Sequence, residues 1–171
     1  VSIVLDLTGY NGEVTFSDDR FIPLTDNRYV YTASCQNLLD ADLTTLPDLS
    51  RAGYSVVGYL FNDEVTVDAS DFAATLLLSN SVQTENGYEL TYSPIFEELN
   101  IEVILDYNYD SRTVTISVPF NGAFGDAEGW EETPIREGYE FVSWTDEEGN
   151  VVTGDTILTN PNGVTLTANW N

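Results

Sequence analysis

Acidic side chains are the residues of this sequence with the most capacity for chemistry. The chain carries 29 Asp and Glu against 5 basic residues, all of them arginine, and it has no histidine. Asp106-Tyr107-Asn108-Tyr109-Asp110 starts like the Asp-x-Asn-x-Asp of a calcium loop. Ser111 replaces the expected glycine, however, and Ser117 stands where a bidentate Glu is required. We therefore predict a solvated turn here and assign no metal ligands and no cofactor.

Other carboxylates give no more specific signal. Asp18-Asp19 and Asp146-Glu147-Glu148 have the composition for weak calcium binding, but turn chemistry explains both stretches equally well. A pair of carboxylates can hydrolyse glycosides, yet in a chain this acidic some pair always falls at a suitable spacing. Without histidine there is no Ser-His-Asp or Cys-His arrangement. We predict that the protein is not an enzyme and assign no catalytic residues.

The composition also limits the partners. Nucleic acid binding needs clustered Lys and Arg, which a net charge of -24 does not offer. Cys35 is the only cysteine, so it forms no disulfide within the chain and is expected to be a small buried apolar residue. No run of about 18 apolar residues exists, so we expect no membrane insertion. The chain begins in a strand-like run without a signal-peptide pattern and resembles an excised, mature piece.

One stretch occurs twice and organises the chain. Arg136-Glu137-Gly138-Tyr139 leads into Glu140-Phe141-Val142-Ser143-Trp144, and Arg51-Ala52-Gly53-Tyr54 leads into Ser55-Val56-Val57-Gly58-Tyr59. In the later copy, Tyr139 and Phe141 alternate with Val142 and Trp144, which is typical of a strand with two faces. The repetition predicts two tandem modules, 1-97 and 98-171.

The start of each module supports the repeat. Ile3 to Leu7 and Glu13 to Phe16 flank Asn11-Gly12, a strong hairpin signal. Val103 to Tyr107 and Thr113 to Ile116 follow the same pattern 100 residues later. We therefore predict the same opening hairpin in both modules.

The modules differ in length before the repeated strand. About 15 extra residues are expected within Ser17 to Asp48 of the first module, including a short helix over Ser34 to Leu43. The counterpart in the second module, Asn121 to Glu132, is expected to be loop-like. A second helix is predicted over Phe72 to Leu78, with Ser70 as its N-cap. Closing strands are predicted over Gly87 to Tyr92 and Gly163 to Trp170.

The second module resembles the internalin-type B-repeat family, also called the Listeria–Bacteroides repeat. The resemblance covers about 70 residues and lies in Val103 to Asn108, Val114 to Phe120, Pro134 to Trp144 and Val164 to Trp170. The first module departs from it, with Tyr59 in place of the usual Trp and Tyr92 in place of the closing Trp. The resemblance implies a mostly β or α+β chain of two small β-grasp-like modules with short helices. It also implies an extracellular, cell-surface protein with no catalytic residues to transfer.

These observations favour a non-enzymatic structural or adhesive segment of a surface protein, such as stalk or adhesin repeats, whose partners are neighbouring repeats. One alternative is a self-assembling subunit of an extracellular filament or pilus that pairs through its terminal strands. Another is a module that binds a glycan or host protein through Ser17 to Asp48. Five tyrosines are candidates for stacking on sugars, although packing within the sheets explains most of them as well: Tyr10, Tyr29, Tyr31, Tyr107 and Tyr109.

Overall fold

The computed structural model describes residues 1–34, 45–130 and 133–171 of the chain. It is mostly β, with several sheets and a few short helices. The chain divides into two units, Val1–Glu97 and Glu98–Asn171, and each is considered by itself below. None of the described helices is long and apolar enough to cross a membrane.

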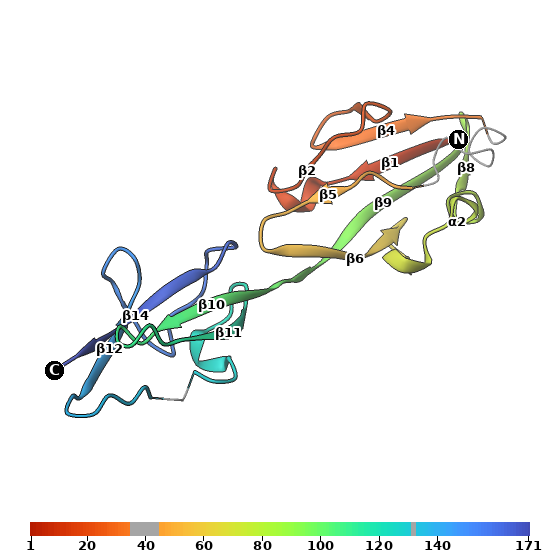
Figure 1. Cartoon of the computed structure of the whole chain (residues 1–171). Coiled ribbons are helices and arrows are strands. Elements are labelled where there is room, and N and C mark those ends of the chain that lie inside the picture. Colours follow the sequence, from red (N-terminus) through yellow and green to blue (C-terminus); the bar gives the residue numbers. More distant parts are fainter. Residues whose placement is uncertain (35–44, 131–132) are drawn as a thin grey trace. The chain divides into compact units, whose positions relative to one another are not determined.

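Unit 2 is one five-stranded sheet with the order β11-β10-β14-β12-β13. Its strands are β10 (Asn100–Asp106), β11 (Thr113–Pro119), β12 (Phe141–Thr145), β13 (Val151–Val152) and β14 (Val164–Trp170). The first and last strands, β10 and β14, lie side by side and are parallel, while the neighbouring pairs are antiparallel (Figure 1). The short 3-10 helix η3 (Phe124–Asp126) follows β11 and places Phe124 in the core.

Unit 1 repeats this order as β4-β1-β9-β6-β7, with additional short strands, and Figure 1 shows β4, β1, β9 and β6 in this succession. These five strands are β1 (Ser2–Asp6), β4 (Arg28–Thr32), β6 (Tyr54–Phe61), β7 (Val65–Asp68) and β9 (Gly87–Glu98). β3 (Ile22–Pro23) extends the sheet beyond β4, β8 (Val82–Thr84) pairs with β9, and β2 (Thr15–Phe16) pairs with β5 (Leu49–Ser50). Again the first and last long strands, β1 and β9, are parallel neighbours. The two units therefore share one strand order around a central parallel pair.

The predicted opening hairpin is correct in unit 2 and wrong in unit 1. β10 pairs with β11 as expected, but the antiparallel partner of β1 is β4, and Thr15–Phe16 pairs with β5 instead. The 3-10 helix η1 (Thr8–Tyr10) continues directly into Asn11 and Gly12, both at positive φ, and carries the chain away from β1. An Asn-Gly turn fixes the local reversal but does not decide which strand fills the neighbouring position.

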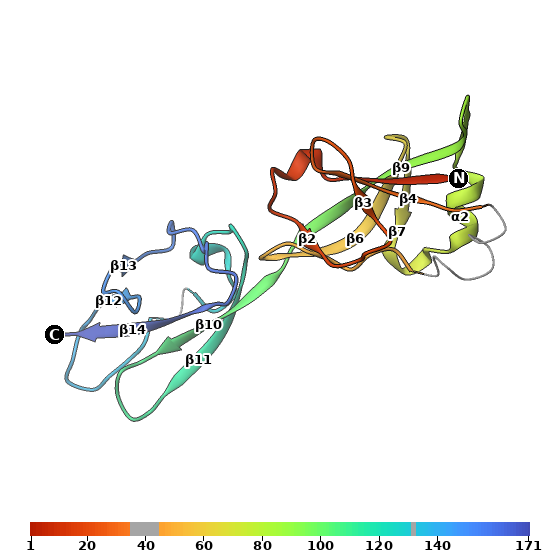
Figure 2. The same ribbon diagram turned by 90° about the horizontal axis from the view of Figure 1, so that it is seen from above.

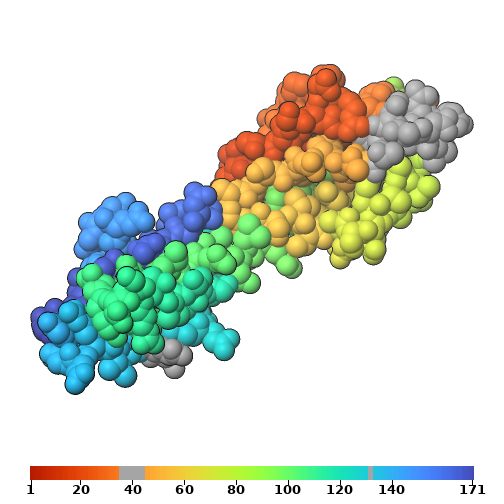
Figure 3. Space-filling model, viewed as in Figure 1, coloured from red at the N-terminus to blue at the C-terminus, as the bar shows by residue number. Residues whose placement is uncertain are grey.

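The extra residues of unit 1 also lie earlier than predicted. The ladder pairs Asp6 with Arg28 in unit 1 and Asp106 with Thr113 in unit 2. Residues 7–27 thus stand where unit 2 has only 107–112, which accounts for the whole difference of 15 residues. We call residues 7–27 the insertion; it appears in red to orange at the surface of unit 1 (Figure 3). The predicted helix over Ser34 to Leu43, and Cys35 with it, falls almost wholly outside the described residues.

The strand registers match the residues of β9 to those of β14 in a different way from the sequence comparison. Val4 pairs with Thr91 and Ile104 pairs with Thr165, so equivalent closing residues are 74 positions apart. The residue at the place of Trp170 is therefore Phe96, and not Tyr92. β9 runs on to Glu98, which leaves room for this aromatic residue.

The central strand of unit 2 does not alternate as its sequence predicts. A register shift between Phe141 and Ser143 turns Phe141 and Trp144 to the same core, where their rings lie 5.3 Å apart. Trp144 is buried, whereas Val142 is 52% exposed and Tyr139, which precedes the strand, is 51% exposed. The predicted alternation is therefore wrong within β12, because a β-bulge adds one residue to the strand between Phe141 and Ser143.

The helix of unit 1 begins later than predicted. Asp68, not Ser70, acts as a cap: its carboxylate accepts a hydrogen bond from the Ser70 backbone N–H at 2.9 Å and starts the 3-10 helix η2 (Ala69–Asp71). The α-helix α2 (Ala74–Ser79) follows without a side-chain N-cap and buries Leu77 completely. Because a one-turn-and-a-half helix has little stability of its own, this apolar contact holds it in place.

Replacing Trp144 by Ala is expected to lower the free energy of unfolding of unit 2 by about 3–5 kcal/mol, because it removes a buried aromatic side chain. Val142→Ala, two residues away on the exposed side of the bulge, should change it by less than about 0.5 kcal/mol. All three tryptophans (130, 144 and 170) belong to unit 2, so urea titration followed by tryptophan fluorescence reports on this unit. Equal losses for the two variants would contradict the bulge.

Candidate functional site

The repeated Arg-x-Gly-Tyr stretch forms a tight turn in both units. The Tyr139 backbone N–H donates to the Arg136 carbonyl oxygen at 3.1 Å, and Tyr54 donates to Arg51 at the same distance. The glycine before each tyrosine has φ near +80°, a conformation that side chains with a Cβ avoid. The motif therefore sets a turn that directs the arginine and the tyrosine to the same side.

In unit 2 this turn anchors a group of side chains that we call the Arg136 cluster: Arg136, Tyr139, Tyr109 and Trp170. The Arg136 guanidinium lies 3.7 Å from the centre of the Tyr139 ring and 5.5 Å from that of Tyr109. The Tyr109 ring meets Trp170 edge to face at 5.6 Å, and its hydroxyl donates to the Ile135 carbonyl oxygen. The Trp170 indole N–H donates to the Tyr107 carbonyl oxygen at 2.8 Å. The cluster joins the end of β14 to the loop after β10.

Unit 1 contains an equivalent group, the Arg51 cluster: Arg51, Tyr54, Tyr10 and Phe96. Arg51 lies 3.9 Å from the Tyr54 ring centre, 5.2 Å from that of Tyr10 and 5.6 Å from that of Phe96. Its Nη2 also forms an ion pair with Glu13 at 2.8 Å. The Tyr10 hydroxyl donates to the Pro94 carbonyl oxygen at 2.5 Å, and burial raises the pKa of Tyr10 while Arg51 opposes that rise. Here Tyr10 comes from the insertion, yet it occupies the place of Tyr109.

Both clusters are suited to holding strands and not to turning over a substrate. A guanidinium over aromatic rings stabilises their packing by about 0.5–2 kcal/mol. The cations are already in contact with ring faces, and the hydroxyls already donate to backbone carbonyls. The sequence analysis did not identify either cluster, although the repetition of an arginine in a chain with only five basic residues was a usable signal.

The acidic loops bind their own backbones. In the stretch that resembles a calcium loop, the Asp106 carboxylate accepts the Asn108 N–H at 2.8 Å, and Tyr107 is buried in the core. Asp146 accepts hydrogen bonds from the Asn150 side chain at 3.0 Å and from its backbone N–H at 2.8 Å. The first of these lowers the pKa of Asp146 most. In the described part of the chain no three His, Cys, Asp or Glu residues come together as metal ligands.

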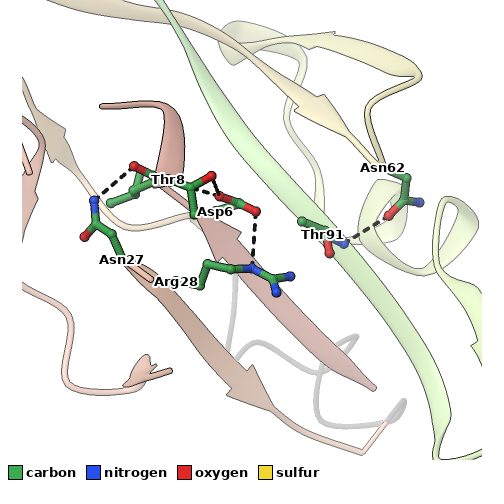
Figure 4. A network of polar contacts seen from close by, with 7 residues as sticks. Asp6, Thr8, Asn27, Arg28, Asn62 and Thr91 are labelled. Atoms are coloured by element: carbon green, nitrogen blue, oxygen red, sulfur yellow. Dashed lines mark hydrogen bonds and ion pairs between the residues drawn. The ribbon is translucent and has the colours of Figure 1, made fainter. Parts of the chain in front are cut away.

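Two ion pairs at the insertion come in addition to that of Arg51 with Glu13. Arg20 Nε donates to Asp18 at 2.8 Å, and this contact holds the pKa of the Asp18 carboxyl below its ordinary value. Arg28 Nε lies 3.2 Å from the Asp6 carboxylate, which also accepts the Thr8 hydroxyl at 2.7 Å (Figure 4). The Arg20–Asp18 pair lies within the insertion, whereas the Arg28–Asp6 pair joins β4 to β1 at the point where the insertion begins and ends.

Open hollows in each unit are candidates for ligand sites. In unit 2 a hollow of about 280 Å³ has apolar walls that include Val152, Leu158 and Leu166, and acidic residues from 146 to 148 lie at its rim. In unit 1 a hollow of about 470 Å³ is lined by residues of the insertion that include Phe16, Asp18 and Phe21. The rings of this second hollow pack edge to face, with Phe16 4.7 Å from Tyr29 and 6.5 Å from Phe21.

The five tyrosines considered for sugar stacking do not form a common platform. Tyr31 and Tyr107 are buried, and Tyr29 is half-buried against Phe16. Tyr10 and Tyr109 belong to the Arg51 and Arg136 clusters of separate units. These tyrosines therefore pack within their own units, and a sugar site on them stays a prediction.

Tyr92 is a polar group within the apolar core of unit 1. Its side chain is fully buried, and its hydroxyl has no hydrogen-bond partner among the described residues. Burial raises its pKa well above the ordinary value. Its ring meets Tyr59 at 5.9 Å and Phe61 at 6.5 Å, so it contributes mainly as a large core side chain.

Comparison with known proteins adds no assignment to this geometry. No family model matches the chain, and no curated protein matches it. The similarity to the B-repeat family therefore stays a prediction based on the sequence.

The Arg136 cluster should contribute measurably to stability. Arg136→Lys is expected to lower the free energy of unfolding of unit 2 by about 1 kcal/mol, because an ammonium does not stack on two rings as a planar guanidinium does. Glu137→Gln, at the exposed next residue, should have an effect below about 0.5 kcal/mol. Urea titration with tryptophan fluorescence measures both, and a fully stable Arg136→Lys variant would show that the stacking contributes nothing.

The Asp18 carboxyl should titrate below the ordinary value of about 3.9 in the folded protein. Since its folded pKa is lowered, the stabilisation it brings is present above pH 4 and is lost as the pH falls through the folded pKa. Carboxyl carbon NMR titration measures this value directly. Arg20→Gln should raise the pKa of Asp18, whereas Arg28→Gln, which removes the other ion pair, should leave it unchanged. A pKa that is insensitive to Arg20 would contradict the assignment.

Proposed function

We propose that the chain is a tension-bearing structural segment of an extracellular surface protein, with two modules in series and no catalytic role. One observation carries the proposal: in both units the first and last long strands are adjacent and parallel. The same arrangement in two units that differ by 15 residues after the first strand indicates that it matters more than the loops around it.

Parallel terminal strands resist tension because of how force reaches their hydrogen bonds. In unit 2, β10 pairs with β14 from Val103 with Val164 to Asp106 with Thr167. The chain enters at the start of β10 and leaves at the end of β14, so tension pulls the two strands past each other along their length. All bonds of the ladder are then loaded together, whereas an antiparallel hairpin pulled from its open end loses them one at a time.

The closing strand has additional anchors in each unit. The Trp170 indole bonds to the Tyr107 carbonyl in unit 2, and the Tyr10 hydroxyl bonds to the Pro94 carbonyl in unit 1. Both contacts connect the last strand to the segment that follows the first strand. They therefore oppose the same sliding motion as the ladder.

The location at the cell surface rests on the sequence. The resemblance to B-repeats implies a surface protein built from serial modules, and the two units of this chain are such a series. A net charge of -24 keeps the surface hydrated and repels neighbouring copies. The carboxylates of Asp106 and Asp146 accept hydrogen bonds from the backbones of their own loops, which fits a structural role for these side chains.

Single-molecule force spectroscopy tests the mechanical role. Handles are attached to unit 2 in the whole chain through Asn100→Cys and Asn171→Cys, with Cys35→Ala removing the one native thiol. We expect a high unfolding force, because this pair of sites shears β10 against β14.

The matched control uses Asn100→Cys with Pro119→Cys. These residues face each other in the β10–β11 ladder, so the same unit is unzipped bond by bond and should open at a clearly lower force. Equal forces in the two geometries, or opening of the sheared pair without a resolved force peak, would exclude a tension-bearing role.

A further inference from the structure

The outer edge of β11 is a strand-pairing surface that no described strand of unit 2 covers. β11 is the first strand in the sheet order and pairs only with β10 in the described part of the chain. Figure 2 shows it at the margin of the unit 2 sheet. Edge strands expose backbone N–H and C=O groups and pair readily with another strand unless they are short, charged, interrupted by proline or covered.

The register identifies which backbone groups of β11 face outward. Tyr107 N–H donates to the Arg112 carbonyl and Phe120 N–H donates to the Leu99 carbonyl, at the two ends of the β10–β11 ladder. Hydrogen-bonded pairs recur at every second residue of an antiparallel ladder, so the even-numbered residues bond to β10. The odd-numbered residues Thr113, Thr115 and Ser117 therefore direct their N–H and C=O groups away from the sheet. Pro119 has no N–H and ends the series.

Unit 1 covers the equivalent edge with its own chain. β4 occupies the place of β11, and β3 from the insertion pairs with its outer side, Ile22 opposite Val30 and Pro23 opposite Tyr29. Leu24 N–H donates to the Arg28 carbonyl at 2.7 Å, so Arg28 and Val30 are the residues whose outward groups are used. These two positions correspond to Thr113 and Thr115. Unit 2 lacks the insertion, and its edge has no such strand.

The other sheet margins carry protection that β11 lacks. β7 has an acidic residue at its end, β3 and β13 have only two residues each, and β8 has three. β11 has seven residues and no charge. The terminal strands β1 and β14 lie in the interior of their sheets, so the edge-to-edge pairing of terminal strands considered from the sequence is not available to them.

We propose that β11 pairs with β11 of a second copy of this chain, antiparallel and about a two-fold axis at Thr115. In this register Thr113 faces Ser117 of the second copy, and the three outward residues of each strand form about six backbone hydrogen bonds. Val114 and Ile116 meet on the core side of the joined sheets, and the hydroxyls of Thr113, Thr115 and Ser117 meet on the other side.

In this register β11 is complementary to itself, because Thr meets Thr or Ser and Val114 meets Ile116, which favours a second copy, while the charge of the chain keeps the complex weak. Two chains of net charge -24 repel each other, and an uncharged strand is where they approach at the lowest electrostatic cost. A strand pair buries much less than a stable interface of about 1,000 Å² or more, so the dimer should have a Kd on the order of 100 µM. The two-fold pairing uses the edge of both copies, so it closes at a dimer and does not continue into a filament.

Sedimentation equilibrium of the whole chain at low and high salt tests the association. The dimer should tighten several-fold between about 0.05 M and 0.5 M NaCl, because salt screens the repulsion. Thr115→Pro removes an outward N–H from both strands without taking a bond from the β10 ladder, and it should weaken the dimer about tenfold or more. A chain that stays monomeric near 1 mM at high salt, or assembles beyond a dimer, overturns the proposal.

A charge-pairing experiment tests the register without relying on proline. Thr115→Asp and Thr115→Lys each place like charges opposite one another and should weaken self-association, whereas their mixture should associate about tenfold more tightly than either alone. Thr66→Asp and Thr66→Lys, at an exposed position on the unit 1 edge strand β7, serve as the matched control. Equal gain on mixing the Thr66 variants, or no gain on mixing the Thr115 variants, overturns the pairing about Thr115.

Discussion

The parallel contact between the first and last long strands is the constraint on which each unit depends. β1 with β9, and β10 with β14, place the first and last long strands of a unit side by side at the centre of its sheet. The remaining strands can only add at the two sides: β11 or β4 next to the first strand, and β12-β13 or β6-β7 next to the last. A parallel pair requires a long crossover connection. The chain that lies between the two strands in the sequence forms this connection, and it must also cover the core.

This constraint explains which parts of the fold the sequence could predict. Strand positions follow from alternation, so β10, β11 and β14 are predicted closely. Partner choice is different, because the Asn11-Gly12 turn predicts a local hairpin and the place beside β1 is taken by β4. The bulge after Phe141 and the cap at Asp68 depend on tertiary contacts, and neither has a pattern of its own in the sequence.

The arginine clusters show a similar limit for side chains. The repeated Arg-x-Gly-Tyr stretch predicts a turn from the glycine alone, but the rings above each guanidinium come from distant segments. Tyr10 and Tyr109 reach equivalent places from loops of different length, and Phe96 replaces Trp170. The sequence comparison pairs Trp170 with Tyr92, whereas the registers of the two parallel ladders show that Phe96 is the equivalent residue.

The insertion in unit 1 changes the margin of a sheet and leaves its centre intact. It supplies β3 to the outer side of β4 and Tyr10 to the Arg51 cluster, but the strand order around the parallel pair is the same in both units. The two units therefore have the same parallel strand pair at the centre and differ in what their edges can contact. In a chain this acidic, an uncharged seven-residue edge in only one of two related units points to association through that unit, since solubility alone would favour charge or cover at both.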